Sequence, residues 1–432
     1  MGIKEANIYL DNQWNTYYAG QTINGRIEYV FDSPKKVRGI HVKIKGEAHT
    51  EWSESKNEQV TDGKEVSVDT LLTGNEEYFQ VSYYLLGSNS GNEIEIPAGK
   101  QVYNFTCTLP PVLPSSFEGQ YGYVRYTVKV TLDRPWKFDQ ETKMAFTVIN
   151  AFDLNLNASY KEPIHIQLEK TFCCFCCASP PLSVDVQAPV SGYVPGQKIP
   201  IRVEIENKSN VQLHLVKIFL RKVVTYRATS PSNQTKKTKD IVLTIQEGPA
   251  PAGSTKSWDL TMEVPPIPPS DLVNCNIIDL DYDFKVECVV SGMHLNMSGK
   301  KYIAIGTVPL VGMIGQATPT APLPEVTGNG ETGPYGPGQP AVLPVSPGQP
   351  MAPSAPGGEG TPGGWVMPGA APVQPYQTLY PTLTTPVYKE SPYSARTIQD
   401  RGESNHMMIR GPNNFAPFYP TYAAVQPPPL PQ

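Results

Sequence analysis

Apolar and polar residues alternate along most of residues 1–306. The stretch 40–45 reads IHVKIK, with apolar side chains on one face and basic or aromatic polar ones on the other, and 124–132 (VRYTVKVTL) follows the same rule. Period-two alternation is typical of antiparallel strands that bury one face and expose the other. Turn residues separate these runs, and convincing helical periods of ten or more residues are absent. The pattern therefore predicts an all-β fold with the strands packed as sandwiches.

The strand pattern occurs twice. The first block, 17–28 (YYAGQTINGRIE), recurs as 193–204 (YVPGQKIPIRVE). Two further blocks return in the same order: 109–115 as 264–270, and 126–130 as 282–286. A repeat this long indicates tandem domains, because solenoid repeats run about 20–50 residues. We therefore expect one sandwich to have been duplicated.

Composition changes sharply after the second copy. Residues 307–432 hold 26 of the 45 prolines but only 10 of the 75 charged residues. A Pro- and Gly-rich segment of this kind lacks the apolar residues needed for a core. We expect a domain at 1–152, an interdomain segment at 153–180, a second domain at 181–306, and a disordered Pro/Gly-rich tail at 307–432.

Several of the repeated residues carry a family resemblance. The block 109–119 (LPPVLPSSFEG), leading into 124–126 (VRY), resembles the N-terminal arrestin domain, and 192–197 (GYVPGQ) resembles the C-terminal one. With 134–136 (RPW), the chain is most similar to the α-arrestins, or arrestin domain-containing proteins. The resemblance covers roughly 5–306. It implies two tandem immunoglobulin-like β-sandwiches that act as adaptors for membrane-protein cargo tails.

Other classes of function find little support. The net charge of −5 argues against nucleic-acid binding, which needs a concentrated basic surface. The six histidines are scattered, without a His-Glu-x-x-His or Gly-x-Ser-x-Gly pattern, so we expect no enzyme activity, cofactor or metal. No apolar run reaches the ~20 residues of a membrane span, and the N-terminus lacks a secretory signal. We expect a cytoplasmic protein that is recruited to the plasma membrane and endosomes.

Specific short motifs occur in the tail. Two copies of a Pro-[Thr/Ser]-Ala-Pro motif resemble ligands of ESCRT-I, and one Tyr-Pro-x-Leu motif resembles ligands of ALIX-type adaptors. Proline favours an extended backbone, which lowers the entropy cost of binding. The motifs are Pro319-Thr320-Ala321-Pro322, Pro353-Ser354-Ala355-Pro356 and Tyr380-Pro381-Thr382-Leu383.

Weaker motifs share the tail. The α-arrestin tail usually carries Pro-Pro-x-Tyr for WW domains of HECT-type ubiquitin ligases, but this chain has no intact copy, so a ligase partner stays open. The candidates are a degenerate WW-type site, a WW- or SH3-type site and a Tyr-x-x-Leu endocytic signal. They are Thr385-Pro386-Val387-Tyr388, Pro428-Pro429-Leu430-Pro431 and Tyr376-Gln377-Thr378-Leu379.

The interdomain segment carries a cysteine cluster, Cys173, Cys174, Cys176 and Cys177. Three interpretations stay open. The cluster is a plain hydrophobic loop, a site of S-acylation that gives peripheral membrane association, or a zinc or redox site completed by Cys275 and Cys288. Basic strand residues are expected to face outward, toward solvent, acidic cargo tails or phosphoinositides. These are Lys43, Lys45, Arg125 and Lys129.

The sequence thus favours a non-enzymatic α-arrestin adaptor that links membrane cargo to ubiquitin-ligase and ESCRT machinery in endocytic and endosomal transport. The alternative is an arrestin-fold signalling scaffold that binds a soluble partner, with the tail serving as a spacer.

Overall fold

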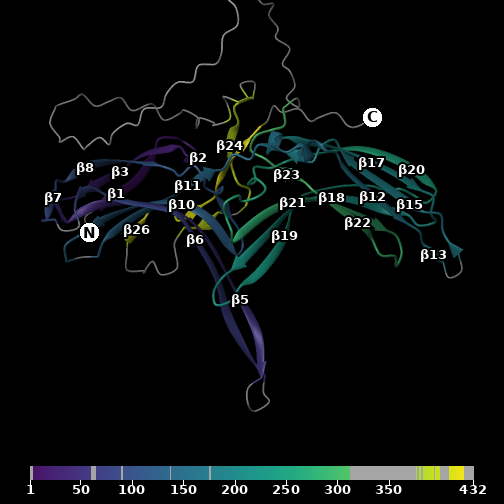
Figure 1. Ribbon diagram of the computed structural model, residues 1–432, viewed down its shortest axis with the longest axis horizontal. Helices are drawn as coiled ribbons and strands as arrows, with labels where there is room; N and C mark the ends of the chain where they lie inside the picture. Colours follow the sequence, from purple (N-terminus) through teal and green to yellow (C-terminus); the bar gives the residue numbers. More distant parts are fainter. Residues whose placement is uncertain are drawn as a thin grey trace, which may run out of the picture. The chain divides into compact units, whose positions relative to one another are not determined.

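The computed structural model describes residues 3–59, 65–88, 91–136, 138–174, 177–311, 376, 379–380, 383–393, 395–398 and 408–422. All of these residues fall in one compact unit. Among them, no segment forms a helix with the length and hydropathy of a membrane span. The regular structure is nearly all β-strand (Figure 1).

The first sandwich packs a three-stranded sheet, order β1-β3-β8, against a larger sheet with the path β2-β11-β10-β5-β6. Strand β9 extends the larger sheet at β10, and β4 pairs with β7. The strands are β1 (Ile3–Leu10), β2 (Thr16–Tyr18), β3 (Thr22–Phe31), β4 (Lys35–Val37), β5 (Gly39–Gln59), β6 (Glu65–Gly87), β7 (Ile94–Ile96), β8 (Gly99–Thr108), β9 (Phe117–Glu118), β10 (Gly122–Asp133) and β11 (Gln140–Ile149).

The second sandwich pairs two four-stranded sheets, orders β12-β15-β17-β20 and β19-β18-β21-β22, with the short pairs β13-β14 and β16-β23. Two 3-10 turns, η1 (Leu154–Leu156) and η2 (Ala158–Lys161), precede it. The strands are β12 (Ile164–Lys170), β13 (Cys173–Cys174), β14 (Cys177–Ala178), β15 (Leu182–Ala188), β16 (Gly192–Tyr193), β17 (Lys198–Asn207), β18 (Leu213–Ala228), β19 (Gln234–Glu247), β20 (Ser254–Glu263), β21 (Ile278–Val290), β22 (Met297–Tyr302) and β23 (Ala304–Ile305).

The alternating sequence pattern determines which face of each strand is buried. In β15 every second residue is buried, from Leu182 to Ala188, and the residues between them are half-exposed. Strand β3 follows the same rule, with Ile23 and Ile27 fully buried. Side chains on these faces fill the cores between the sheets, which is the arrangement that the period of two predicts.

The internal repeat corresponds to repeated local geometry. Gly20 and Gly196 both have φ of +84°, a left-handed conformation that favours glycine, in the turn before each long strand. The Tyr126 hydroxyl donates to the carbonyl of Pro114 at 2.6 Å, and the Tyr282 hydroxyl donates to that of Pro268 at 2.9 Å. These paired contacts show the same local geometry at repeat-related positions, as expected for a duplicated sandwich.

The domain edges differ from the sequence-based expectation in two places. Strand β12 lies within the segment expected to connect the domains, yet it pairs with β15 along its whole length and belongs to the second sandwich. Beyond residue 306, Val308 and Leu310 are buried, and the Thr307 hydroxyl accepts from the Phe152 backbone N–H. The second sandwich therefore extends past the expected boundary.

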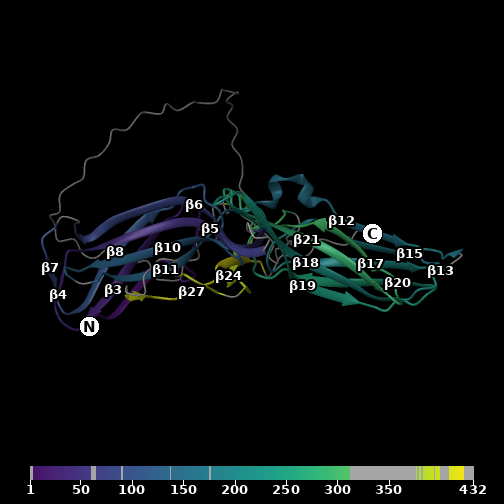
Figure 2. The ribbon, with the colours of Figure 1, turned by 90° about the horizontal axis from the view of Figure 1, so that it is seen from below.

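Strands also occur far along the expected tail. They are β24 (Val387–Glu390), β25 (Arg396–Thr397), β26 (Met408–Arg410), β27 (Asn414–Phe415) and β28 (Phe418–Thr421), coloured yellow in Figure 2. Strand β24 pairs with β28, and β25 pairs with β27. The composition of 307–432 predicts a disordered tail, and these strands are an exception to that prediction. The tail motifs at 319–322, 353–356 and 428–431 lie outside the described residues.

Candidate functional site: the tail-docking surface

The described residues between 376 and 422, called here the docked segment, attach to the sandwiches through β11. Strand β26 pairs in parallel with β11, with Gln140 opposite Met408 and Thr142 opposite Arg410. Strand β2 pairs with the other end of β11, at 147–149. Together β2 and β26 cover an edge whose backbone groups would otherwise be open to pairing with another chain.

Side chains and backbone groups of the sandwiches complete the attachment. The backbone N–H of Phe418 donates to the Thr147 hydroxyl at 3.1 Å, and the Tyr419 hydroxyl donates to the Ser116 carbonyl at 2.9 Å. The N–H of Tyr422 donates to the carbonyl of Pro195 at 2.8 Å. The docked segment therefore contacts residues of both sandwiches.

Four buried tyrosines, Tyr18, Tyr376, Tyr388 and Tyr422, form what we call the tyrosine cluster. The hydroxyl oxygen of Tyr18 lies 3.2 Å from that of Tyr376 and 3.1 Å from that of Tyr388. The Tyr376 and Tyr422 hydroxyl oxygens are 2.6 Å apart, and the Tyr422 hydroxyl donates to the Thr307 carbonyl at 2.7 Å. Only Tyr18 comes from the sandwiches; the other three belong to the docked segment.

The Thr307 carbonyl fixes the direction of this hydrogen-bond chain. Each tyrosine has one hydroxyl proton, and a carbonyl can only accept. Since Tyr422 donates to Thr307, Tyr376 donates to Tyr422, Tyr18 to Tyr376, and Tyr388 to Tyr18. Burial raises the pKa of Tyr376 and holds that of Tyr18 well above its usual range, so the hydroxyls keep their protons.

Apolar side chains surround the cluster. Tyr18, Tyr376 and Tyr388 pack with Ile149, Val308 and Leu383 in one buried group. The rings of Tyr18 and Tyr376 meet edge to face with centroids 5.9 Å apart, a favoured aromatic geometry. Docking thus combines apolar burial with a fully paired set of hydroxyls.

The structure places described residues of two sequence-predicted tail motifs on this surface. Tyr380, the first residue of the Tyr-Pro-x-Leu motif, donates its hydroxyl to Asp153 Oδ2 at 2.8 Å, and Leu383, its last residue, is buried. Tyr388 of the degenerate WW-type site is buried in the tyrosine cluster, while Thr385 is exposed. A partner that needs these side chains must compete with the sandwiches for them. Pro381 and Thr382 lie outside the described residues.

A buried ion pair lies beside the docked segment. Arg125 donates from Nε and Nη2 to the two carboxylate oxygens of Glu118, at 2.8 and 2.7 Å. Each side chain is 4% exposed, so the expectation that Arg125 faces outward is wrong. The Glu118 carboxylate, on the strand that pairs with this end of β10, and the Tyr123 ring, whose centroid is 3.9 Å from the guanidinium carbon, lie against Arg125. A cavity of about 500 Å³ adjoins the pair, and Arg396 and Thr397 of β25 form part of its wall.

Lys222 is a second buried cation on this surface. Its ammonium lies 3.8 Å from the ring centroid of Tyr393 in the docked segment and 3.5 Å from Asp240 Oδ2. Burial lowers the pKa of Lys222, and Asp240 opposes that effect. The cation–π contact ties the docked segment to β18 of the second sandwich. Of the basic residues expected to face outward, Lys45 pairs with Glu47 and Lys129 with Glu141.

The cysteine cluster lies on a short hairpin. Backbones of Cys173–Cys174 (β13) and Cys177–Ala178 (β14) pair antiparallel; Cys176 lies outside the described residues. Close to this hairpin, the Phe172 and His294 rings are 4.9 Å apart, and the flanking Met293 and Leu295 are 105% and 82% exposed. Apolar side chains therefore project next to the hairpin. Cys288, a suggested zinc ligand, is fully buried in β21, which raises its pKa to about 12.

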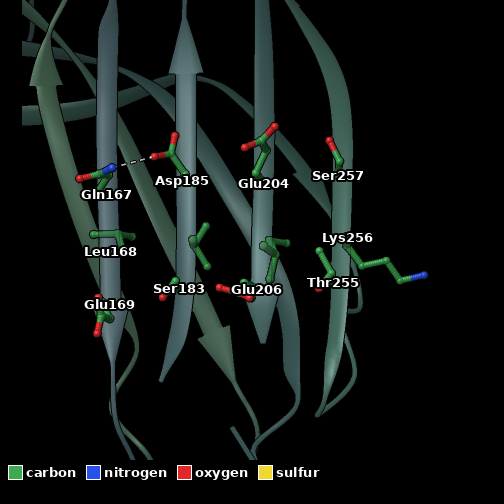
Figure 3. A pocket seen from close by; sticks show the side chains of 12 residues that line it. Gln167, Leu168, Glu169, Ser183, Asp185, Glu204, Glu206, Thr255, Lys256 and Ser257 are labelled. Carbon is green, nitrogen blue, oxygen red and sulfur yellow. Dashed lines mark hydrogen bonds between the residues drawn. The ribbon is translucent and has the colours of Figure 1, made fainter. Parts of the chain in front are cut away.

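Two further features of the described residues resemble binding sites. A hollow of about 600 Å³ lies on the β12-β15-β17-β20 sheet (Figure 3), where Gln167 donates to Asp185 at 3.1 Å. Four acids line it, and two of them, Glu204 and Glu206, pair with Arg202 and Lys208. Elsewhere, the carboxylates of Asp271, Asp279 and Asp281 lie within 4.8 Å of one another. Neither arrangement points to a particular ligand.

Sequence analysis missed the residues of the sandwiches that hold the docked segment. A signal for one of them existed. In the internal repeat, Tyr18 corresponds to Val194, so a hydroxyl stands where the second copy has an aliphatic side chain. Ser116, just before β9, and Thr147, on β11, gave no such signal, because small polar residues are common on strands and in the loops beside them.

These features define a protein of two arrestin-type sandwiches with a carboxy-terminal segment docked on them. Comparison with known families agrees. Residues 6–155 match the family "Arrestin (or S-antigen), N-terminal domain", and residues 178–310 match "Arrestin (or S-antigen), C-terminal domain". The chain belongs to the arrestin family, within its arrestin domain-containing group.

Three relatives illustrate the similarity. Arrestin domain-containing protein 17 of Caenorhabditis elegans is 27% identical over 433 residues, covering 96% of this chain and 98% of that protein. Human arrestin domain-containing protein 4 is 30% identical over 309 residues, covering 71% of each chain. Human thioredoxin-interacting protein is 30% identical over 281 residues, covering 61% of this chain and 70% of that protein. These relatives support an arrestin-type adaptor or scaffold as the class of function.

Proposed function

We propose that this protein is a non-enzymatic adaptor that links membrane-protein cargo to ESCRT-I and ALIX-type adaptors in endocytic and endosomal transport. The sandwiches bind cytosolic cargo tails, and the proline-rich tail recruits the sorting machinery. One observation carries the proposal: the Pro-[Thr/Ser]-Ala-Pro motif occurs twice, at Pro319–Pro322 and Pro353–Pro356. Two copies on one tail raise the effective concentration at a multivalent partner.

WW-domain HECT ligases are a weaker part of the proposal. The chain has only the degenerate site ending at Tyr388 and the site at 428–431. Tyr388 is buried in the tyrosine cluster, so a WW domain would reach it only after undocking. Ligase recruitment through Tyr388 is therefore expected to be weak while the segment is docked.

Membrane association is proposed from the β13–β14 hairpin. Met293 and Leu295 project beside a hairpin that carries cysteines, and Lys170 lies near them, with its ammonium close to the Leu295 carbonyl. Exposed apolar residues near a cation suit a lipid headgroup boundary, and acylation would add about 0.8 kcal/mol per buried methylene. A cytoplasmic protein recruited in this way would reach the plasma membrane and endosomes.

Motif loss tests the adaptor proposal. Single peptides of this kind bind with about −4 to −8 kcal/mol, so Pro319→Leu with Ala321→Leu should reduce ESCRT-I capture only modestly. Adding Pro353→Leu with Ala355→Leu should reduce it by about 100-fold, because avidity is lost with the second site. Full-length protein would be captured from cell extract and scored by immunoblotting for ESCRT-I subunits.

A matched control carries Pro337→Leu with Pro344→Leu, which alters the same tail outside both motifs. This control should capture ESCRT-I as well as the unmodified protein does. If the fourfold motif variant also does so, the ESCRT-I proposal is wrong, and the signalling-scaffold alternative with the tail as spacer takes its place.

A further inference from the structure

Tyr376 occupies the centre of the tyrosine cluster. Its hydroxyl is hydrogen-bonded to those of both Tyr18 and Tyr422, and its side chain is 3% exposed. Because Tyr422 donates to Thr307, the Tyr376 hydroxyl is the donor in the hydrogen bond between Tyr376 and Tyr422. Tyr422 cannot supply one in return, because its own proton is donated to the Thr307 carbonyl. An oxygen without a proton at Tyr376 would therefore face Tyr422 as acceptor against acceptor.

The surroundings of Tyr376 are also unsuited to negative charge. The buried group around it consists of Tyr18, Ile149, Val308, Leu383 and Tyr388, with Trp14, Tyr380 and Phe418 at its margin. The Tyr376 hydroxyl has two further tyrosines as hydrogen-bond partners, and none of the described lysines or arginines acts on its pKa. At the margin of the group, the carboxylate of Asp153 accepts from Tyr380. Burial already raises the pKa of Tyr376, which is the same physical preference for an uncharged ring.

A phosphate group at this position could not be accommodated in the docked state. Phosphotyrosine carries about −1.5 to −2 charges at neutral pH and needs several donors or a cation. The cluster offers it a single donor, the hydroxyl of Tyr18. Burying so large a charge without a partner is strongly unfavourable. Phosphorylation and docking of Tyr376 therefore exclude one another.

The segment that carries Tyr376 is suited to reaching a kinase once it leaves the sandwiches. Pro372, Pro375 and Pro381 flank the tyrosine in sequence and favour an extended backbone, the form in which kinases bind peptides. The strand pairing that docks the segment is also short: among its described strands, β26 is the one that pairs with a sandwich strand, and it has three residues. Short pairings at an edge open more readily than the long strands of a core.

We propose that Tyr376 is a phosphorylation site for an ATP-dependent protein tyrosine kinase, and that its phosphorylation holds the docked segment off the sandwiches. The phenolic oxygen forms a bond to the γ-phosphorus of ATP, and the bond from that phosphorus to the β,γ-bridging oxygen breaks. ADP leaves with the electron pair, and the phenolic proton passes to the base of the kinase. The proposal concerns docking and does not depend on which partners the tail recruits.

The first arm of the test measures access. Full-length protein is incubated with a broad-specificity tyrosine kinase domain and ATP, and occupancy of each tyrosine is followed by mass spectrometry. Tyr422→Ala removes an anchor of the docked segment and should speed phosphorylation of Tyr376 by at least about tenfold. Tyr302, which is 42% exposed on β22, serves as the internal control and should react at the same rate in both proteins. If Tyr376 stays unmodified even in the Tyr422→Ala protein, the proposal is overturned.

The second arm measures the effect on docking. Phosphotyrosine is installed at position 376 by codon expansion, with phosphotyrosine at 302 as the matched control. Hydrogen exchange should become at least about tenfold faster at the amides of 140–142, 418, 419 and 421 in the first protein and stay unchanged in the second. Treatment with a tyrosine phosphatase should restore protection. Unchanged protection in the protein phosphorylated at 376 would overturn the proposal.

Discussion

The buried pair of Arg125 and Glu118 gives the sharpest test of how the first sandwich is held together. In Arg125→Met, the Glu118 carboxylate, whose side chain is 4% exposed in the structure, loses both charge-assisted hydrogen bonds, at 2.8 and 2.7 Å. Removing one partner of a buried pair costs about 3–5 kcal/mol of unfolding free energy, because the remaining charge is left unpaired. We expect a loss of that size at pH 7, measured by urea unfolding with tryptophan fluorescence.

The pH dependence of that loss follows from the pKa of Glu118. Burial raises this pKa, and Arg125 opposes the rise, so the pKa should rise further in Arg125→Met. A carboxyl group whose folded-state pKa lies above its unfolded value of about 4.3 takes up a proton more readily when folded. The deficit of the variant should therefore be complete above the folded-state pKa and shrink as the pH falls through it.

Two controls make the reasoning refutable. Lys208→Met removes an exposed ion pair of similar length: Lys208 Nζ lies 2.7 Å from Glu206 Oε1, and the two side chains are 59% and 52% exposed. This substitution should lower the unfolding free energy by only about 0–1 kcal/mol. Glu118→Gln added to Arg125→Met should recover part of the deficit, because the unpaired charge is gone. A deficit below about 1 kcal/mol at pH 7, or one that is constant between pH 7.5 and 4.5, would refute the assignment of a buried, unpaired carboxylate.

Two further predictions concern the docked segment and the cysteine hairpin. Tyr18→Phe removes a hydroxyl that links Tyr376 to Tyr388, so docking should weaken by about 1–3 kcal/mol, with faster hydrogen exchange at 140–142; unchanged exchange would contradict this. Replacing the four cysteines of 173–177 by serine should move the protein from the membrane to the soluble fraction of cell extract, and hydroxylamine should do the same to the unmodified protein. Zinc bound to purified protein and lost in the serine variant would instead favour the metal interpretation.

The sandwiches could be predicted from sequence because their information is local and repeated. Alternation in 124–132 predicts a strand, and β10 spans it. Gly20 and Gly196 indicate matching turns, which the structure confirms through their equal φ angles. Strand β12 was missed as part of a domain because it follows two 3-10 turns, so the segment as a whole looked like a connection.

The docking surface could not be predicted because its two halves are remote in sequence. Tyr18 and Tyr376 are 358 residues apart, and neither segment alone shows why a hydroxyl should be buried there. The composition of 307–432 taken as a whole also predicts disorder, because prolines are far more numerous there than the tyrosines that make the docking contacts. The prediction for Arg125 is wrong for a related reason: alternation predicts the face of a strand but not which side chains pack over that face.

The position of the tail motifs relative to the docked segment divides them into two groups. The motif Tyr380–Leu383 lies inside the segment, so a partner can bind this motif only in those molecules whose segment is undocked. Its apparent dissociation constant then rises by the inverse of that population, about 100-fold if 1% of molecules are undocked. The motifs at 319–322 and 353–356 lie before the segment in sequence and do not share its contacts. Under the proposed function, any event that releases the segment would therefore strengthen capture of ALIX-type adaptors and leave capture of ESCRT-I unchanged.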